Sequence, residues 1–347
     1  MISEESKLSG NKNVFWRWIP GLLLSAIAIF ALFKMVPIDK AIVVLKNTPF
    51  TYYLFSALFT LLFLLVRTIG WRALLGFRAS YKETFLKLSL GYFINNIFPF
   101  RLGEISRAIF MGASIKVNPG QILSSIFIER ILDLLILAFF LLIMLPQVVG
   151  MVWIKTTAWI ILVLMVIGLV VLFLIILNSS KVESILEKLG KKSNFFKRLV
   201  IPFFISLLAG LMSLKNPKQF FIGLLGVLGS WLVSFIQFSI LLSLFAQNTE
   251  WWWGAFANTI LALGVALPSA PAGLGIYESS VVAGLKLFNI DESIALAFAI
   301  VMHVSQFVLI AGLGLFALMR DGLSLRSLFS ELLKFKNQQS IERKIGE

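Results

Sequence analysis

The 347 residues are 59% hydrophobic and only 14% charged, whereas soluble domains have about 45–50% apolar and about 25% charged residues. This composition excludes a disordered chain, a secreted disulfide scaffold and an ordinary cytosolic enzyme. Cysteine is absent and His303 is the one histidine, which excludes thiolate and multi-histidine metal sites, and we expect no cofactor. The sequence therefore predicts one all-α polytopic membrane domain over residues 1–347.

Apolar runs long enough to cross a membrane, which takes about 20 residues, predict six full spans. They cover residues 18–36, 50–66, 121–145, 157–177, 219–245 and 294–319. Three more apolar stretches are shorter or interrupted, namely 84–100, 199–214 and 253–287. Prolines and glycines break the first and third of them, which is typical of re-entrant hairpins and of the broken helices of transporters.

The formal net charge of +14 does not indicate a nucleic-acid partner, because the cations lie in short segments between the apolar runs. With a cytoplasmic N-terminus, the segments 1–17, 66–120, 178–218 and 320–347 face the cytoplasm and hold 25 of the 31 lysines and arginines. The positive-inside rule favours this orientation. It predicts that both termini are cytoplasmic, with a cytoplasmic tail over 320–347. It also predicts a basic loop over 178–218, in which residues 199–214 form a helix that lies at the membrane–water interface or is partly inserted.

This topology implies an inverted repeat. Residues 84–120 would enter and leave the membrane from the inside, and residues 253–287 would do so from the outside. Each hairpin is flanked by two spans, so 50–145 and 219–319 become two repeats of opposite polarity. In transporters of this architecture the substrate site lies near the membrane midplane, where the helix breaks meet.

Three short motifs follow one another along the chain: GEISR at 103–107, Glu129-Arg130 with Asp133, and PAGLGIYE at 271–278. Together they resemble the flippase-like family of lysylphosphatidylglycerol-synthase transmembrane regions over residues 15–320. The resemblance implies a multi-pass inner-membrane protein, bacterial or archaeal, that handles a phospholipid or a lipid-linked head group. The best-known relatives also carry a soluble synthetase domain. This sequence ends at Glu347 without one, so we expect no lysyl-transfer chemistry.

Ionisable side chains inside a membrane span are costly, and they are therefore candidates for function. Glu129, Arg130 and Asp133 lie in the predicted span 121–145. They are candidates to contact substrate. Alternatively, Arg130 and Asp133 form a structural i,i+3 pair, and Glu129 caps a neighbouring helix break.

The first hairpin offers a site for phosphate. Arg101 and Arg107 flank Gly103 and Glu104, and an arginine beside a glycine turn can bind phosphate through two hydrogen bonds. The alternative is that both arginines only fix the membrane topology. We include all four residues among the substrate-binding candidates.

The second hairpin contains Pro271, Gly273, Gly275 and Glu278. Prolines fix a break and glycines let the backbone approach a ligand. Glu278 suits a cationic head group or a coupling proton, or it pairs with an arginine of the first hairpin. His303, in the last span, is a further candidate. The reading we favour is a hydrogen bond between helices, and the alternative is a proton carrier.

Three functions compete at this level. The first is a lipid translocator, the second a membrane-embedded transferase and the third a non-catalytic partner of an envelope enzyme. The sequence has no nucleotide-binding loop, metal cluster or activated nucleophile, which argues against an enzyme. Matched hairpins with buried charge favour the translocator. Its expected partners are the lipid bilayer and a phospholipid or lipid-linked substrate, and we expect no nucleic-acid partner. A homo-oligomer is possible.

Overall fold

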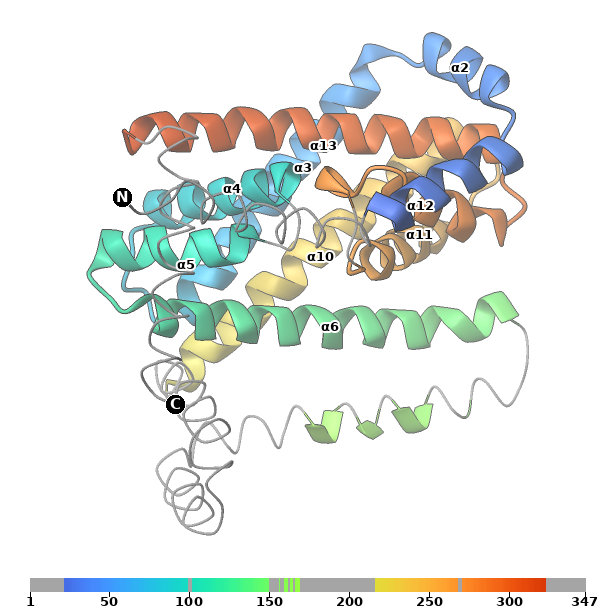
Figure 1. The fold of residues 1–347 in the computed structure, drawn as a ribbon. Helices are drawn as coiled ribbons and strands as arrows, with labels where there is room; N and C mark the ends of the chain where they lie inside the picture. Colours follow the sequence, from blue (N-terminus) through green and yellow to red (C-terminus); the bar gives the residue numbers. More distant parts are fainter. Residues whose placement is uncertain are drawn as a thin grey trace, which may run out of the picture.

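The computed structural model describes residues 22–98, 102–149, 216–267 and 270–322, with a few helical residues between 156 and 168. Every regular element within these ranges is a helix (Figure 1). After a helix over Leu22–Met35 come α2 (Ile38–Asn47), α3 (Phe50–Leu74), α4 (Tyr81–Ile97), α5 (Leu102–Ile115), α6 (Pro119–Val149), α10 (Pro217–Phe245), α11 (Trp251–Gly264), the 3-10 helix η2 (Pro271–Gly273), α12 (Ile276–Lys286) and α13 (Glu292–Arg320).

Four helices, α3, α6, α10 and α13, are long and apolar enough to cross a membrane, so the prediction of an all-α polytopic membrane protein is confirmed. Within the first expected span, 18–36, the structure describes the helix Leu22–Met35, which meets α2 at an angle of 88°. The bend falls at Pro37, which lacks the N–H that a continuous helix needs. Counting this bent pair, the described residues hold up to five spans. The expected span 157–177 and the loop 178–218 lie mostly outside the described residues.

The helix α3 is longer than the predicted span 50–66. It runs on to Leu74, so Arg67 lies inside the helix, not in a cytoplasmic loop. The predicted end of the span at residue 66 was wrong. A run of apolar residues ends at the first charge, whereas the backbone hydrogen bonds of a helix can continue through a charged residue. A buried arginine is tolerated there because acidic side chains of α6 surround it.

The helices α3 and α10 cross at a contact between glycines. A Cβ built on Gly226 would lie 2.4 Å from the Cα of Gly70, so neither position has room for a side chain. Small residues of this kind let membrane helices approach closely, and close approach supplies the packing that holds them together. This crossing joins the two halves of the bundle.

The same packing pattern recurs in both halves. The helix α5 packs on α6 as α12 packs on α13, and the hairpins are exchanged, since α4 packs on α13 and α11 on α6. In Figure 1, α4 lies beside α13, and α10 crosses behind the centre of the bundle. This twofold pattern agrees with two related halves. Their limits at 50–145 and 219–319, the hairpin limits 84–120 and 253–287, and their opposite membrane polarity stay predictions.

Candidate functional site

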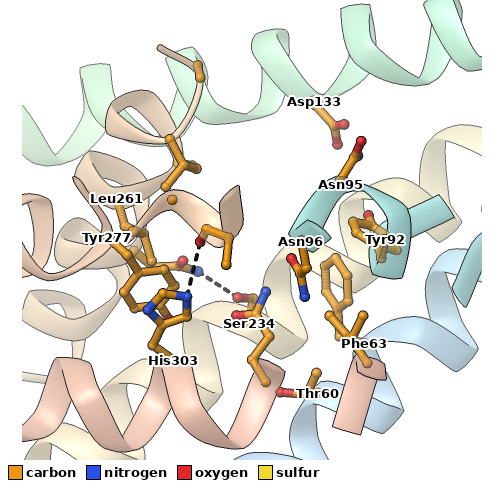
Figure 2. A pocket seen from close by; sticks show the side chains of 18 of the residues that line it. Thr60, Phe63, Tyr92, Asn95, Asn96, Asp133, Ser234, Leu261, Tyr277 and His303 are labelled. Carbon is orange, nitrogen blue, oxygen red and sulfur yellow. Dashed lines mark hydrogen bonds between the residues drawn. The ribbon is translucent and has the colours of Figure 1, made fainter. Parts of the chain in front are cut away.

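A cavity of about 560 Å³ lies where the two helix breaks meet. On one side it is walled by the end of α4 and the start of α5, through Asn95, Phe98 and Glu104. The turn before α12 closes the other side through Ala270, Ala272 and Gly273. The helix α4 contacts η2 directly, and Figure 2 shows the residues of both hairpins facing the same space.

The cavity wall has a charged end and a neutral polar end. Arg67, Glu104, Arg130 and Asp133 form the charged end. The neutral end combines amides and hydroxyls, which both donate and accept hydrogen bonds; they belong to Thr60, Asn96, Ser234, Gln237, Asn258 and Gln306. Asn95 also lines the cavity and lies beside Asp133 (Figure 2).

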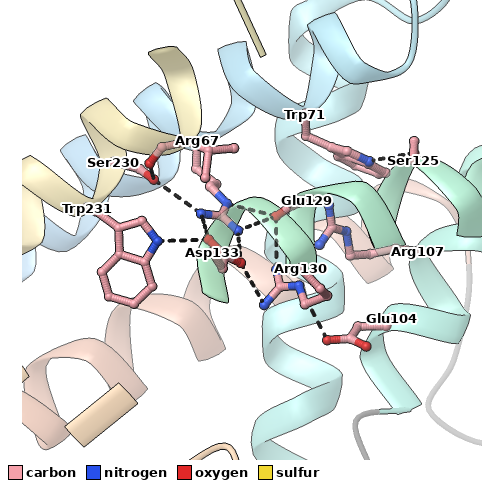
Figure 3. Close-up of polar contacts among 11 residues, drawn as sticks. Arg67, Trp71, Glu104, Arg107, Ser125, Glu129, Arg130, Asp133, Ser230 and Trp231 are labelled. Carbon is pink, nitrogen blue, oxygen red and sulfur yellow. Dashed lines mark hydrogen bonds and ion pairs between the residues drawn. The ribbon is translucent and has the colours of Figure 1, made fainter. Parts of the chain in front are cut away.

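Arg67 is the centre of the charged end, with 1% of its side chain exposed. Its guanidinium binds Asp133 through two hydrogen bonds, Nη1 to Oδ1 at 2.6 Å and Nη2 to Oδ2 at 2.5 Å. Its Nε donates to Glu129 Oε1 at 2.7 Å (Figure 3). Trp231 also donates to Asp133, at 2.8 Å. Two-point contacts of this kind are geometrically specific, so the three charges hold α3 and α6 in a fixed register.

Arg107 and Glu129 lie behind the cavity wall. Arg107 Nη2 donates to Glu129 Oε2 at 2.7 Å, and its guanidinium carbon lies 3.9 Å from the centre of the Trp71 ring, a cation–π contact. Only 3% of the Arg107 side chain is exposed, and Glu129 is fully buried. Neither residue lines the cavity, and Glu129 binds arginines instead of capping a helix break.

Arg130 is the most accessible of the three arginines, with 28% of its side chain exposed. Its Nη2 donates to Glu129 at 2.9 Å and its Nη1 lies 3.3 Å from Asp133, so the predicted i,i+3 pair is present. Its Nε makes no hydrogen bond, and Glu104 Oε1 lies 3.7 Å away from it. The Nε atom is buried, so the part of Arg130 that the cavity can reach is the rest of its partly exposed side chain.

The first helix break is held by Asn95, whose side-chain oxygen accepts the N–H of Gly103 at 2.8 Å. A Cβ at Gly103 would lie 1.9 Å from the carbonyl oxygen of Gly91, so α5 returns against α4 only because this position is glycine. The facing Gly91 makes room for the Arg107 side chain, which its own Cβ would meet at 2.4 Å. Arg101 lies outside the described residues.

The second break ends in a cap made by Glu278, whose Oε2 accepts the Gly275 N–H at 2.8 Å. Its Oε1 lies 2.6 Å from His303 Nδ1. Glu278 is therefore paired with His303 and not with Arg107, and the favoured reading of His303 as a hydrogen bond between helices agrees with the structure. Gly273 and His303 line the cavity, whereas Pro271, Gly275 and Glu278 lie behind them.

Sequence reasoning missed Arg67, Trp231, Gln237 and Asn258. A signal for Arg67 was present, because the apolar run resumes beyond it and reaches Trp71 one helical turn later. Gln237 also had a signal, because it is an amide in the interior of the charge-free span 219–245. In the structure it donates to the Ser56 carbonyl of α3 at 2.9 Å. Trp231 looked like any apolar residue of that span.

Long apolar helices around two broken hairpins, with a polar cavity at the breaks, define a polytopic membrane protein with buried charge. Residues 18–314 match the family model of the lysylphosphatidylglycerol synthase TM region, and the chain belongs to that family. It is similar to two UPF0104 membrane proteins of Methanocaldococcus jannaschii. MJ1595 is 24% identical over 86% of this chain and 93% of its own length, and MJ1078 is 28% identical over 62% and 88%. No solved structure matches.

Proposed function

We propose that the protein moves a phospholipid, or another lipid-linked polar head group, between the leaflets of the inner membrane, with both termini in the cytoplasm. The observation that carries this proposal is the polar cavity enclosed by apolar helices, with Arg130 partly exposed at its charged end. Head-group phosphate is the anion that a guanidinium in a membrane would meet. The neutral amides at the other end suit an uncharged polar part of the same head group.

The cavity also has a route for acyl chains. Leu134, Leu267 and Phe307 line it, and 58%, 53% and 40% of these residues are exposed. We infer that these apolar side chains contact lipid tails in a membrane. A head group can therefore occupy the cavity while its chains stay in the bilayer, which is the arrangement that lipid movement requires.

The test is lipid movement in reconstituted vesicles. Phosphatidylglycerol with a fluorescent acyl chain is added as a trace to phosphatidylcholine vesicles, and a membrane-impermeant reductant quenches the label in the outer leaflet only. The wild-type protein should expose the inner-leaflet label to quenching. Arg130→Ala should abolish this movement, and Arg130→Lys should restore part of it, because an ammonium group cannot reproduce a planar guanidinium contact.

The matched control is Arg78→Ala, which removes an exposed arginine from the loop between α3 and α4. It should move lipid at the wild-type rate. Lipid movement at the wild-type rate by a folded Arg130→Ala protein would contradict the proposal. The proposal would also fail if vesicles with the wild-type protein moved lipid no faster than protein-free vesicles. In that case the alternative, a non-catalytic partner of an envelope enzyme, would take its place.

A further inference from the structure

His303 joins α13 to the second hairpin through both of its ring nitrogens. Nδ1 lies 2.6 Å from Oε1 of Glu278, and Nε2 lies 3.1 Å from the backbone oxygen of Ala272. The ring stacks on Tyr277, with the ring centres 4.1 Å apart and the planes 9° from parallel (Figure 2). His303 is 8% exposed and forms part of the cavity wall.

The two partners of His303 are oxygens, so the geometry sets the number of protons. A carbonyl oxygen only accepts, and a carboxylate only accepts unless it is protonated. Both contacts are hydrogen bonds when the His303–Glu278 pair carries two protons. One sits on Nε2, and the other sits between Nδ1 and Oε1. With one proton fewer, one of the two contacts places a lone pair against a lone pair.

The carboxylate cannot turn away to relieve this conflict, because its other oxygen accepts the Gly275 N–H at 2.8 Å. Loss of a proton must then break the link to Glu278 or the link to Ala272. Ala272 lies in η2 with a φ of 57°, a conformation that L-residues seldom adopt. The contact from His303 helps to hold this turn against the cavity.

We propose that His303 and Glu278 form a proton-binding latch on the cavity wall. With two protons, the pair ties the Pro271–Gly273 turn to α13. After loss of one proton, the remaining proton stays between Nδ1 and the carboxylate, because the charged acceptor makes the stronger hydrogen bond, and the turn is released from Nε2. This inference rests on the proposed function in one respect, because release of the turn would couple lipid movement to proton concentration. The chemistry of the latch itself is independent of any lipid.

Other ionisable groups share the surroundings of His303. Tyr277 is stacked on it, and its buried hydroxyl has no hydrogen-bond partner. The charged and phenolic groups that line the same cavity from other helices are Arg67, Tyr92, Glu104, Arg130 and Asp133. The helix α2, which also packs on α13, carries Asp39, Lys40 and Lys46. Within the described part of the chain, Glu278 is the one ionisable side chain that is hydrogen-bonded to a ring nitrogen of His303.

Two substitutions move the latch in opposite directions. In Glu278→Gln, the amide nitrogen can donate to Nδ1 and the amide oxygen can accept from Gly275. A neutral His303 then keeps its Nε2 proton for Ala272, and the latch stays closed at every pH. In His303→Phe, the stack on Tyr277 is kept but both links are lost, and the latch stays open at every pH.

The test measures the position of the turn. The chain has no cysteine, so spin labels can be placed at Leu274→Cys, beside the turn, and at Val308→Cys on α13, where 54% and 63% of the residues are exposed. The distance between the labels is measured in vesicles from about pH 5 to about pH 9, a range that brackets imidazole titration. We expect a single short distance at low pH and an added longer one at high pH.

Glu278→Gln should show only the short distance across this range, and His303→Phe should show the longer one throughout. A wild-type distance that does not change with pH would overturn the latch, and so would a His303→Phe protein that follows the wild-type change. Lipid movement is measured on the same vesicles. If lipid moves at the same rate at every pH and the distance between the labels stays fixed, the latch alone is contradicted. If the distance between the labels changes with pH but no lipid moves, the proposed function alone is contradicted.

Discussion

Arg67 should be essential for the fold and not only for the cavity. Its side chain is buried and makes three short contacts to Asp133 and Glu129. In Arg67→Met, an unbranched apolar side chain takes the place of the guanidinium. The buried cluster then holds the three acids Glu104, Glu129 and Asp133 against only two arginines.

Removing one partner of a buried ion pair costs about 3–5 kcal/mol, because the other charge stays buried without compensation. We expect this loss for Arg67→Met. Asp133→Leu should cost a similar amount, since it leaves three arginines against two acids and removes the acceptor of the Trp231 N–H. The double variant restores the balance at two charges of each sign. Its loss should therefore be well below the sum of the two single losses.

The assay is thermal unfolding in mild detergent at one scan rate, because membrane proteins often unfold irreversibly and apparent midpoints then depend on the rate. Both single variants should unfold at clearly lower temperatures than the wild type, and the double variant should recover much of the difference. Arg78→Met, at an exposed position in the loop after α3, is the matched control. Additive losses in the double variant, or a wild-type midpoint for Arg67→Met, would refute the reasoning.

Three more outcomes are expected. Gly103→Ala should destabilise the fold by about 1–3 kcal/mol, seen as a lower unfolding midpoint, because the new Cβ would lie 1.9 Å from a backbone oxygen of α4; an unchanged midpoint would show that the hairpin is packed less closely. Cysteines at Gln247 and Arg78 should react with an impermeant maleimide from opposite sides of the membrane, and labelling of both from one side would overturn the topology. Glu104→Gln should retain more co-purifying phospholipid by mass spectrometry, because it removes a carboxylate that competes for Arg130; less lipid than in the wild type would contradict this competition.

The sequence predicted the long helices well, because a run of about 20 apolar residues without charge has few alternatives to a buried or membrane helix. Its errors fall where local hydropathy and backbone geometry disagree. Arg67 marks the end of an apolar run but not of a helix, since α3 continues to Leu74. The acids that accommodate Arg67 are distant in the chain, in α6.

The candidate site was predicted in outline, since the two interrupted segments do meet at the cavity. The pairing of charges could not be predicted. Arg130 and Asp133 were interpreted as a pair within their own helix and Glu129 as a cap, whereas Arg67, which binds Glu129 and Asp133, lies about 60 positions earlier in α3. For Glu278, pairing with an arginine was one of the alternatives, and in the structure it pairs with His303. Each of these pairings joins two helices of the same half, α3 to α6 and α12 to α13, and depends on how those helices pack, which hydropathy does not encode.

The balance of charge in the cavity wall affects how tightly the cavity can bind an anionic head group. In the charged cluster three arginines face three acids, so it needs no ligand to be neutral. An anionic head group at Arg130 must then compete with Asp133 and Glu104, and the net gain in free energy is small. Weak, reversible contact is what a translocator requires, because a lipid that binds tightly in one leaflet is released slowly into the other. A cluster with a surplus arginine would bind phosphate more tightly and move lipid more slowly.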